Sequence, residues 1–372
     1  MSRRFVSLGA IAGIPLRLDL TWFLLIAGLV WALPRVYLQE ALPPDALPFR
    51  WLVALLIALT FAAAVLLHEL AHAAAARAVH LSIQHITLSL FGGGLSLLEE
   101  RDTPGQELLI SLAGPGATLL VGFVFLGIYR LSNPVLPVIA VAAHALSFMC
   151  VALGAFNLLP ALPLDGGQAL SALFWFLSGD RNGATRWAAR IGQFIGTALT
   201  IAGLGIWLTR DIREWVWVAI VGLSVEGGSR TTQRRASAQR ALEGQVAADA
   251  MLRGCVPLDP KLTLSALDDV MAEHSVPCLI VGDERGVCGM LSERSLRRVR
   301  PERWASTTLE SVMVPLTEQN KVPPEMPLAR VLQRMAEQNL EELPVMRGET
   351  LLGVVERHEI IRLIESRIAL GI

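Results

Sequence analysis

The chain of 372 residues carries two histidines and a glutamate close together in an otherwise apolar stretch. His68, Glu69 and His72 form the pattern HELAH, and Glu69 is the one formally charged side chain between Trp51 and Ala76. Apolar helices of about 20 residues span the hydrocarbon core of a bilayer. An ionisable group at that depth costs roughly 2.5–3.5 kcal/mol on insertion scales and rarely lacks a function. These three residues are therefore the first candidates for chemistry.

The spacing of the two histidines predicts a metal site. Residues four apart lie on one face of a helix, so His68 and His72 can present imidazole nitrogens to the same ion. Glu69 lies beside them, where it can deprotonate a water molecule. Two histidines, a carboxylate and an open position for water are the usual arrangement of hydrolytic zinc. The alternative is a hydrogen-bonded polar cluster that holds helices together. That alternative must account for the burial of three polar groups.

A third metal ligand is predicted in the segment FNLLPALPLDGGQAL, residues 156–170. Pro160 and Pro163 interrupt the backbone hydrogen bonds there. Unwound backbone at membrane depth is tolerated only where it lines a cavity or is packed in protein. Asp165 lies in this break, at the start of the next apolar helix, and is placed to meet the metal. Its alternative role is to cap that helix.

The elements that must position these residues divide the chain in two. It is 53% hydrophobic and 17% charged, but long apolar runs fill the part up to Val225 and charges recur after it. We expect a membrane domain over 1–225, a basic linker or helical extension over 226–245, and a soluble domain over 246–366. The formal net charge of −1 gives no indication of a nucleic-acid partner.

The membrane domain is expected to be polytopic and α-helical, with about six transmembrane helices. The run 165–208 is broken near 178–186, and no cleavage site follows the first span, which is therefore expected to be retained. An even count and flanking arginines place both termini, and the soluble domain, in the cytoplasm of a multi-pass cell-membrane protein. The expected spans are roughly 20–37, 51–78, 106–130, 135–159, 165–208 and 214–225.

The four cysteines, Cys150, Cys255, Cys278 and Cys288, show no CxxC spacing. Three of them fall in the soluble part of the chain. We expect no disulfide framework, in keeping with a reducing cytosol.

Residues 246–366 contain an internal repeat, with copies over 246–300 and 308–366. The first copy includes SVPCLIVGDERGVCGMLSERSL and the second NLEELPVMRGETLLGVVERHEI. Each has an opener ending in Met, a helix, a proline leading into a buried strand, a glycine turn, a second strand and a helix. This plan resembles a tandem pair of CBS domains, an α/β regulatory module.

The motifs HELAH and NLLPALPLDGG together resemble the site-2 protease family of intramembrane zinc metalloproteases. The resemblance extends through GIPLRLDLTWFLL at 13–25 and FGGGLSLLEERDTPGQELLISLAGPGA at 91–117. It implies one zinc ion per chain, bound by His68, His72 and Asp165. It further implies that Glu69 is the general base, which then passes the proton to the leaving amine.

The same resemblance implies residues that contact substrate. Asn157 and Pro163 would position substrate or hold their loop. Gly92, Gly93 and Gly94 match a hairpin that presents an edge strand to an extended peptide. For these glycines an ordinary flexible turn is the alternative.

The CBS-like module departs from nucleotide-binding copies, which place Ser or Thr three residues before an Asp that holds ribose hydroxyls. The equivalent positions are Ser292 and Ser295 in the first copy, and Glu356 and Glu359 in the second. Only Glu359 keeps a carboxylate at the ribose position. Two possibilities stay open. One is an adenine nucleotide bound through Ser292, Glu356 and Glu359, and the other is a homodimer without ligand.

The activity expected from these features is hydrolysis of a peptide bond within or near the transmembrane segment of a single-span membrane protein. The CBS module would regulate that reaction from the cytoplasm. The alternative is a CBS-regulated cation transporter, in which His68, Glu69, His72 and Asp165 form an ion path. Transport gives Glu69 no reason to lie between two histidine ligands, so the pattern favours hydrolysis.

Overall fold

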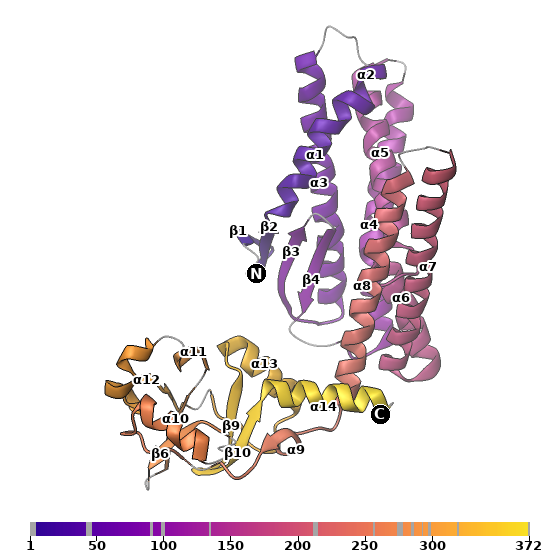
Figure 1. The fold of residues 1–372 in the computed structure, drawn as a ribbon. Coiled ribbons are helices and arrows are strands. Elements are labelled where there is room, and N and C mark those ends of the chain that lie inside the picture. Colours follow the sequence, from indigo (N-terminus) through magenta and orange to yellow (C-terminus); the bar gives the residue numbers. More distant parts are fainter. Residues whose placement is uncertain are drawn as a thin grey trace. The chain divides into compact units, whose positions relative to one another are not determined.

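The computed structural model has two compact units, Met1–Arg234 and Arg235–Ile372 (Figure 1). The first is a helical unit with one sheet, and the second mixes short strands and helices. This confirms the predicted fold class, a helical region with apolar spans followed by an α/β module. The structure describes residues 5–41, 47–89, 92–97, 101–133, 135–210, 215–255, 257–273, 278–283, 286–291, 293–296, 299–317 and 320–370.

Most of the first unit is helical. Among the described residues, four helices are long and apolar enough to cross a membrane, namely α3, α4, α5 and α7, against the six expected from the sequence. Helix α1 is apolar but has only 16 residues, and α6 has 14. The helices are α1 (Thr21–Val36), α2 (Leu38–Ala41), α3 (Leu47–Ala78), α4 (Pro104–Ser132), α5 (Pro137–Asn157), α6 (Asp165–Ser178), α7 (Arg181–Arg210) and α8 (Trp215–Leu242).

A capping box fixes where α4 begins. The Thr103 hydroxyl accepts from the Gln106 N–H at 3.3 Å, and the Gln106 side chain accepts from the Thr103 N–H at 3.3 Å. Together these bonds satisfy donors that the first turn of a helix leaves unpaired. Helix α4 packs against α3.

A four-stranded sheet accompanies the helices, with the order β1-β2-β3-β4. Ala12 and Gly13, both at positive φ (51° and 78°), form the tight turn between β1 and β2. Strand β2 pairs parallel with β3, and β3 pairs antiparallel with β4, which lies at one end of the sheet. The strands are β1 (Phe5–Ile11), β2 (Ile14–Asp19), β3 (Ile83–Ser89) and β4 (Gly92–Leu97).

The predicted span over 165–208 is two helices, α6 and α7. Helix α6 ends at Ser178 because Gly179 takes the left-handed conformation (φ 72°), which glycine adopts without steric cost. Asp180 then starts α7, since its carboxylate accepts the N–H of Gly183 at 2.9 Å.

The segment expected as a linker, 226–245, is helical up to Leu242. The structure therefore has the helical extension that the sequence left open. Glu226 and Arg230 form an i,i+4 ion pair within it, and no proline interrupts it. Gly244, at φ 72°, follows the helix end. Helix α8 thus belongs to both units.

The second unit repeats one plan twice, as predicted. Strand β5 of the first copy pairs with β10 of the second, and β8 of the second pairs with β7 of the first, so the copies exchange strands. The first copy holds α9 (Ala247–Ala250), β5 (Met251–Leu252), α10 (Leu264–Glu273), β6 (Ile280–Asp283), β7 (Gly286–Met290) and α11 (Glu293–Leu296). The second holds α12 (Leu309–Val312), β8 (Val314–Pro315), α13 (Leu328–Gln338), β9 (Glu342–Arg347), β10 (Thr350–Glu356) and α14 (Arg357–Leu370).

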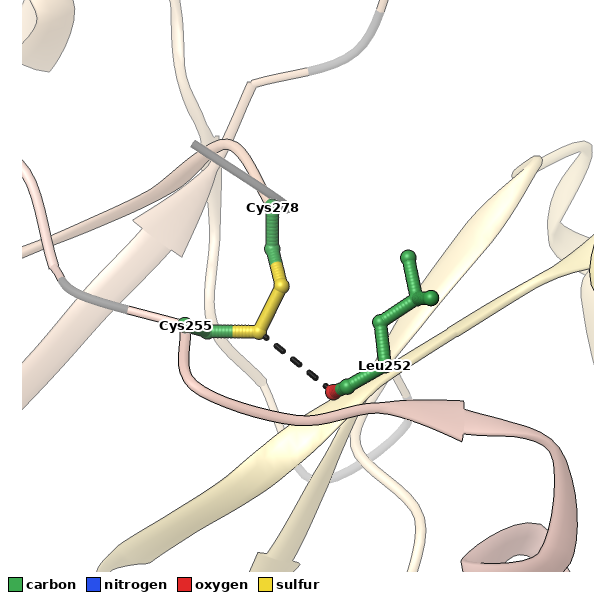
Figure 2. Close-up of a disulfide and its surroundings, with 3 residues drawn as sticks. All are labelled: Leu252, Cys255 and Cys278. Atoms are coloured by element: carbon green, nitrogen blue, oxygen red, sulfur yellow. Dashed lines mark hydrogen bonds between the residues drawn. A yellow bond between two sulfur atoms is a disulfide. The ribbon is translucent and has the colours of Figure 1, made fainter. Parts of the chain in front are cut away.

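The prediction that the cysteines form no disulfide is wrong. Cys255 and Cys278 are bonded across 23 residues, with Cα atoms 5.3 Å apart (Figure 2). The two meet because the segments after β5 and before β6 pack together, a proximity that cysteine spacing does not reveal. The Cys255 sulfur lies 3.6 Å from the Leu252 carbonyl oxygen, a sulfur–oxygen contact because a disulfide has no S–H. Cys150 and Cys288 are free.

Two glutamates face each other across the β9–β10 hairpin. Glu342 and Glu356 are paired in register. Burial, and secondarily the charge of Glu356, raise the pKa of Glu342 to about 7 from an ordinary 4.5. The folded state therefore binds this proton more tightly than the unfolded chain does. The associated stability is present below about pH 4.5 and is lost as pH rises through 7.

Glu342→Gln should remove this pH dependence, because the amide cannot ionise. We expect the β9 and β10 amides of the wild-type chain to lose hydrogen-exchange protection between about pH 5 and 8, after correction for intrinsic exchange. The Glu342→Gln variant should keep its hydrogen-exchange protection across the same pH range. Glu349→Gln, in an exposed turn, is the matched control and should behave as wild type. Equal pH dependence in wild type and Glu342→Gln would contradict the prediction.

Candidate metal centre

Three side chains converge inside the first unit. Nε2 of His68 and Nε2 of His72 lie 3.1 Å apart. Oδ2 of Asp165 lies 3.2 Å from the first and 3.4 Å from the second. The two histidines are only 4% and 6% exposed. In the part of the chain that the structure describes, this is the one group of His, Cys, Asp and Glu side chains able to hold a metal ion.

The histidines come from consecutive turns of α3, and Asp165 comes from the first residue of α6. Leu164 occupies the N-cap position and makes no side-chain cap bond, while the Asp165 carboxylate points at the imidazoles. The chain folds back tightly to allow this. A Cβ at Gly166 would lie 2.5 Å from the Leu159 carbonyl oxygen, so only glycine permits the approach.

Helix α4 determines which imidazole nitrogens carry protons. Nδ1 of His72 lies 2.6 Å from the Ile110 carbonyl oxygen, which can only accept, so this Nδ1 is protonated. Nδ1 of His68 lies 2.6 Å from the Thr118 hydroxyl. That hydroxyl donates its one proton to the Gly114 carbonyl at 2.8 Å, so it must accept from His68. Both neutral imidazoles therefore keep a lone pair on Nε2.

These protonation states fit a zinc ion. Two Nε2 lone pairs and a carboxylate oxygen point at one another within 3.4 Å in a buried space. Without a cation or a shared proton between them they repel. Two imidazole nitrogens and one carboxylate oxygen form a usual ligand set for catalytic zinc. The bonds from Nδ1 to α4 are of the kind that orient ligating histidines.

Gly114 leaves room for this group. A Cβ there would lie 2.7 Å from Nε2 of His68 and closer still to Nε2 of His72. Real Cβ atoms essentially never approach so closely, so any side chain would displace the imidazoles. Gly116, two residues on, has nothing within 4 Å of its hypothetical Cβ.

Comparison with known proteins agrees with this centre. The family model "Peptidase family M50" matches residues 56–144 and 133–202, and the CBS domain model matches 246–302 and 312–366. A Synechocystis sp. protein named "Putative zinc metalloprotease sll0528" is 30% identical, over 98% of this chain and 96% of its own length. The chain belongs to peptidase family M50, the site-2 proteases.

Matches from one archaeon are also similar. Zinc metalloprotease MJ0392 of Methanocaldococcus jannaschii is 25% identical over 96% of this chain and 95% of its own. The solved structure of a site-2 protease from the same organism is 26% identical, with a TM-score of 0.45, covering 62% of this chain and 95% of that one.

In this M50 chain, Glu69 is buried beside the ligands, at 4% exposure. A helical repeat of 3.6 residues puts it about 60° around α3 from His72. Its carboxylate is not one of the three converging groups. Its role as the general base stays a prediction.

The structure does not bring Asn157 or Pro163 into the three-ligand group. The Asn157 side chain donates to the Leu153 carbonyl of its own helix at 3.1 Å. Pro163 is exposed in the loop before α6. Their roles toward substrate stay predictions.

The three glycines of the expected hairpin are strand residues, and not a flexible turn. Gly92, Gly93 and Gly94 begin β4 and pair with Ser89, Leu88 and Thr87 of β3. Since β4 ends the sheet, the expected edge strand is present.

Of the residues predicted for a nucleotide, Ser292 lies outside the described part of the chain. Glu356 ends β10 and Glu359 lies in the first turn of α14. His358 lies 2.8 Å from the first carboxylate and 3.1 Å from the second. The role of these residues toward a nucleotide stays a prediction.

Sequence reasoning missed the contribution of α4. The segment SLAGPGA at 111–117 is rich in small residues, which indicates close helix packing but not the partner. The packing is indeed close, but its partners are the two imidazoles. Ile110, Gly114 and Thr118 are spaced by four, and a Gly and a Thr on one face of an apolar helix were the available signal.

Gly114→Ala should lose most of its zinc, because the methyl group occupies the space of the imidazole nitrogens. We expect zinc affinity to fall at least tenfold, which is the lower end of the range for changes that alter the orientation of metal ligands. Zinc per chain, measured by mass spectrometry of the metal after dialysis in detergent, checks this. Gly116→Ala on the same helix should retain wild-type zinc. Full zinc in Gly114→Ala would contradict the close approach of α4 to the imidazoles.

Thr118→Val keeps the shape of the side chain but removes the hydroxyl that accepts from Nδ1 of His68. We expect zinc affinity to fall about 10–100-fold, as for other residues that orient ligating histidines. Competition with a chromophoric chelator measures it. Thr60→Val on α3 is the control, since Thr60 bonds only the Leu56 carbonyl of its own helix. An unchanged dissociation constant in Thr118→Val would show that Thr118 does not orient His68.

Proposed function

We propose that this chain is an intramembrane zinc endopeptidase that hydrolyses a peptide bond within or near the transmembrane segment of a single-span membrane protein. Such cleavage releases a soluble domain, as in regulated intramembrane proteolysis. The observation that carries the proposal is the convergence of His68, His72 and Asp165, with both Nε2 lone pairs directed inward by α4. Glu69 beside them supplies the remaining catalytic group.

The residues of the centre have separate roles in the reaction. Zinc bound by the two histidines and Asp165 supplies a Lewis acid that polarises the scissile carbonyl and acidifies a water molecule. The Glu69 carboxylate takes the proton of the attacking water and then delivers it to the amide nitrogen as the C–N bond breaks. Burial of Glu69 keeps that proton from exchanging with bulk water.

Substrate binding is proposed at β4. A peptide is cleaved in an extended conformation, so a substrate helix must first unwind. An extended segment can then add as a strand to the end of the sheet. Gly92, Gly93 and Gly94 support this role, because strand residues without side chains let another backbone come close.

We propose six crossings, by α1, α3, α4, α5, α7 and α8, with α6 as a half-helix inside the membrane. An even number puts both termini on one side. The arginines of α8, Arg230, Arg234, Arg235 and Arg240, support a cytoplasmic location for that side. The CBS module would then be cytoplasmic. There it would regulate the protease and join two copies into a homodimer.

Glu69→Gln tests the function. The amide cannot take a proton, so cleavage of a panel of single-span model substrates in detergent should fall at least about 10²-fold. Zinc content should stay at the wild-type value, because Glu69 is not one of the three converging ligands. The His68→Ala/His72→Ala variant should lose both zinc and cleavage.

Other outcomes separate the alternatives. Wild-type cleavage by Glu69→Gln would show that Glu69 is not the base. If wild type binds zinc but cleaves nothing, while liposomes carrying it show a cation flux that Glu69→Gln abolishes, the chain is a transporter.

A further inference from the structure

The loop between α5 and α6 leads directly into Asp165, the first residue of α6. Two tight turns brace it, with the Ala161 N–H bonded to Leu159 at 2.7 Å and the Leu164 N–H bonded to Ala161 at 2.9 Å. Leu162 lies within the second turn and is only 4% exposed. Its carbonyl therefore needs a donor from elsewhere, because an unpaired carbonyl at this depth is costly.

Ser229 of α8 supplies that donor. Its hydroxyl, which is fully buried, donates to the Leu162 carbonyl oxygen across 67 residues of sequence. Other hydroxyls of the same helix behave differently. Ser224 and Thr231 donate to carbonyls four residues earlier in α8, the usual bond of Ser and Thr within helices. Ser229 alone among these three reaches the loop.

Two glycines clear the space for this contact. A Cβ at Gly192 of α7 would lie 3.0 Å from the Leu162 N atom and closer to the Ser229 hydroxyl. A Cβ at Gly228 of α8 would lie 2.6 Å from Cδ of Pro163. The loop is thus packed between α7 and α8 at backbone distance, and Ser229 makes the polar bond there.

We infer that Ser229 is a positioning residue for Asp165. Its bond holds the Leu162 carbonyl, and the turn from Ala161 to Leu164 connects that carbonyl to the first residue of α6. Losing the bond lets the loop shift, and Oδ2 of Asp165 shifts with it relative to the two Nε2 atoms. The inference rests on the proposed function, in which these three groups bind zinc.

A thermodynamic cycle on the full-length protein in detergent tests the inference. Zinc dissociation constants are measured by chelator competition for Ser229→Ala with Asp165 intact and in an Asp165→Ala background. We expect about a tenfold loss of affinity in the first case. In the second we expect almost none, since the ligand that Ser229 positions is already missing. Ser229→Cys, a weaker donor, should fall between wild type and Ser229→Ala.

Ser224→Ala is the matched control, on the same helix, and should leave zinc affinity unchanged in both backgrounds. Equal losses for Ser229→Ala in the two backgrounds would mean general loosening of the bundle and would overturn the inference. No loss in either background would overturn it as well. A wild-type chain that binds no zinc would instead overturn the proposed function, and the inference with it.

Discussion

Two N–H groups determine what this centre can do. Nδ1 of His68 and Nδ1 of His72 donate to α4, and both acceptors have no proton left to give. The remaining lone pairs therefore face each other and Asp165 in a largely buried space. Such an arrangement is stable only around a cation or a shared proton.

Close backbone approach is the second requirement, and glycine meets it at several places in and around the centre. Gly114 brings α4 against the imidazoles, and Gly166 folds the loop under Asp165. Gly192 and Gly228 let α7 and α8 pack against that loop at backbone distance. In a bilayer, helices gain little from burying apolar surface against one another, so close packing and hydrogen bonds must hold them together.

The sequence predicted the parts of this protein that depend on local spacing. HELAH, the broken segment before Asp165 and the repeated strand–helix plan all appear in the structure where expected. The acceptors of α4, the bond from Ser229 to Leu162 and the Cys255–Cys278 disulfide join residues far apart in sequence. Whether residues 226–245 continue as a helix or form a linker was ambiguous for another reason. The polar half of α8 has no apolar periodicity that distinguishes a helix from a linker.

The two histidines and the aspartate of the centre are held in place in different ways. His68 and His72 lie on one unbroken helix, so their separation is fixed by the helical repeat. Asp165 begins a helix after a broken segment, and its distance from the histidines depends on what holds that segment. One holder is α8, which continues to Leu242 in the hydrophobic core of the second unit. A displacement of α8 at Ser229 would therefore act on the loop before the third ligand, whereas the spacing of the first two ligands is set within α3.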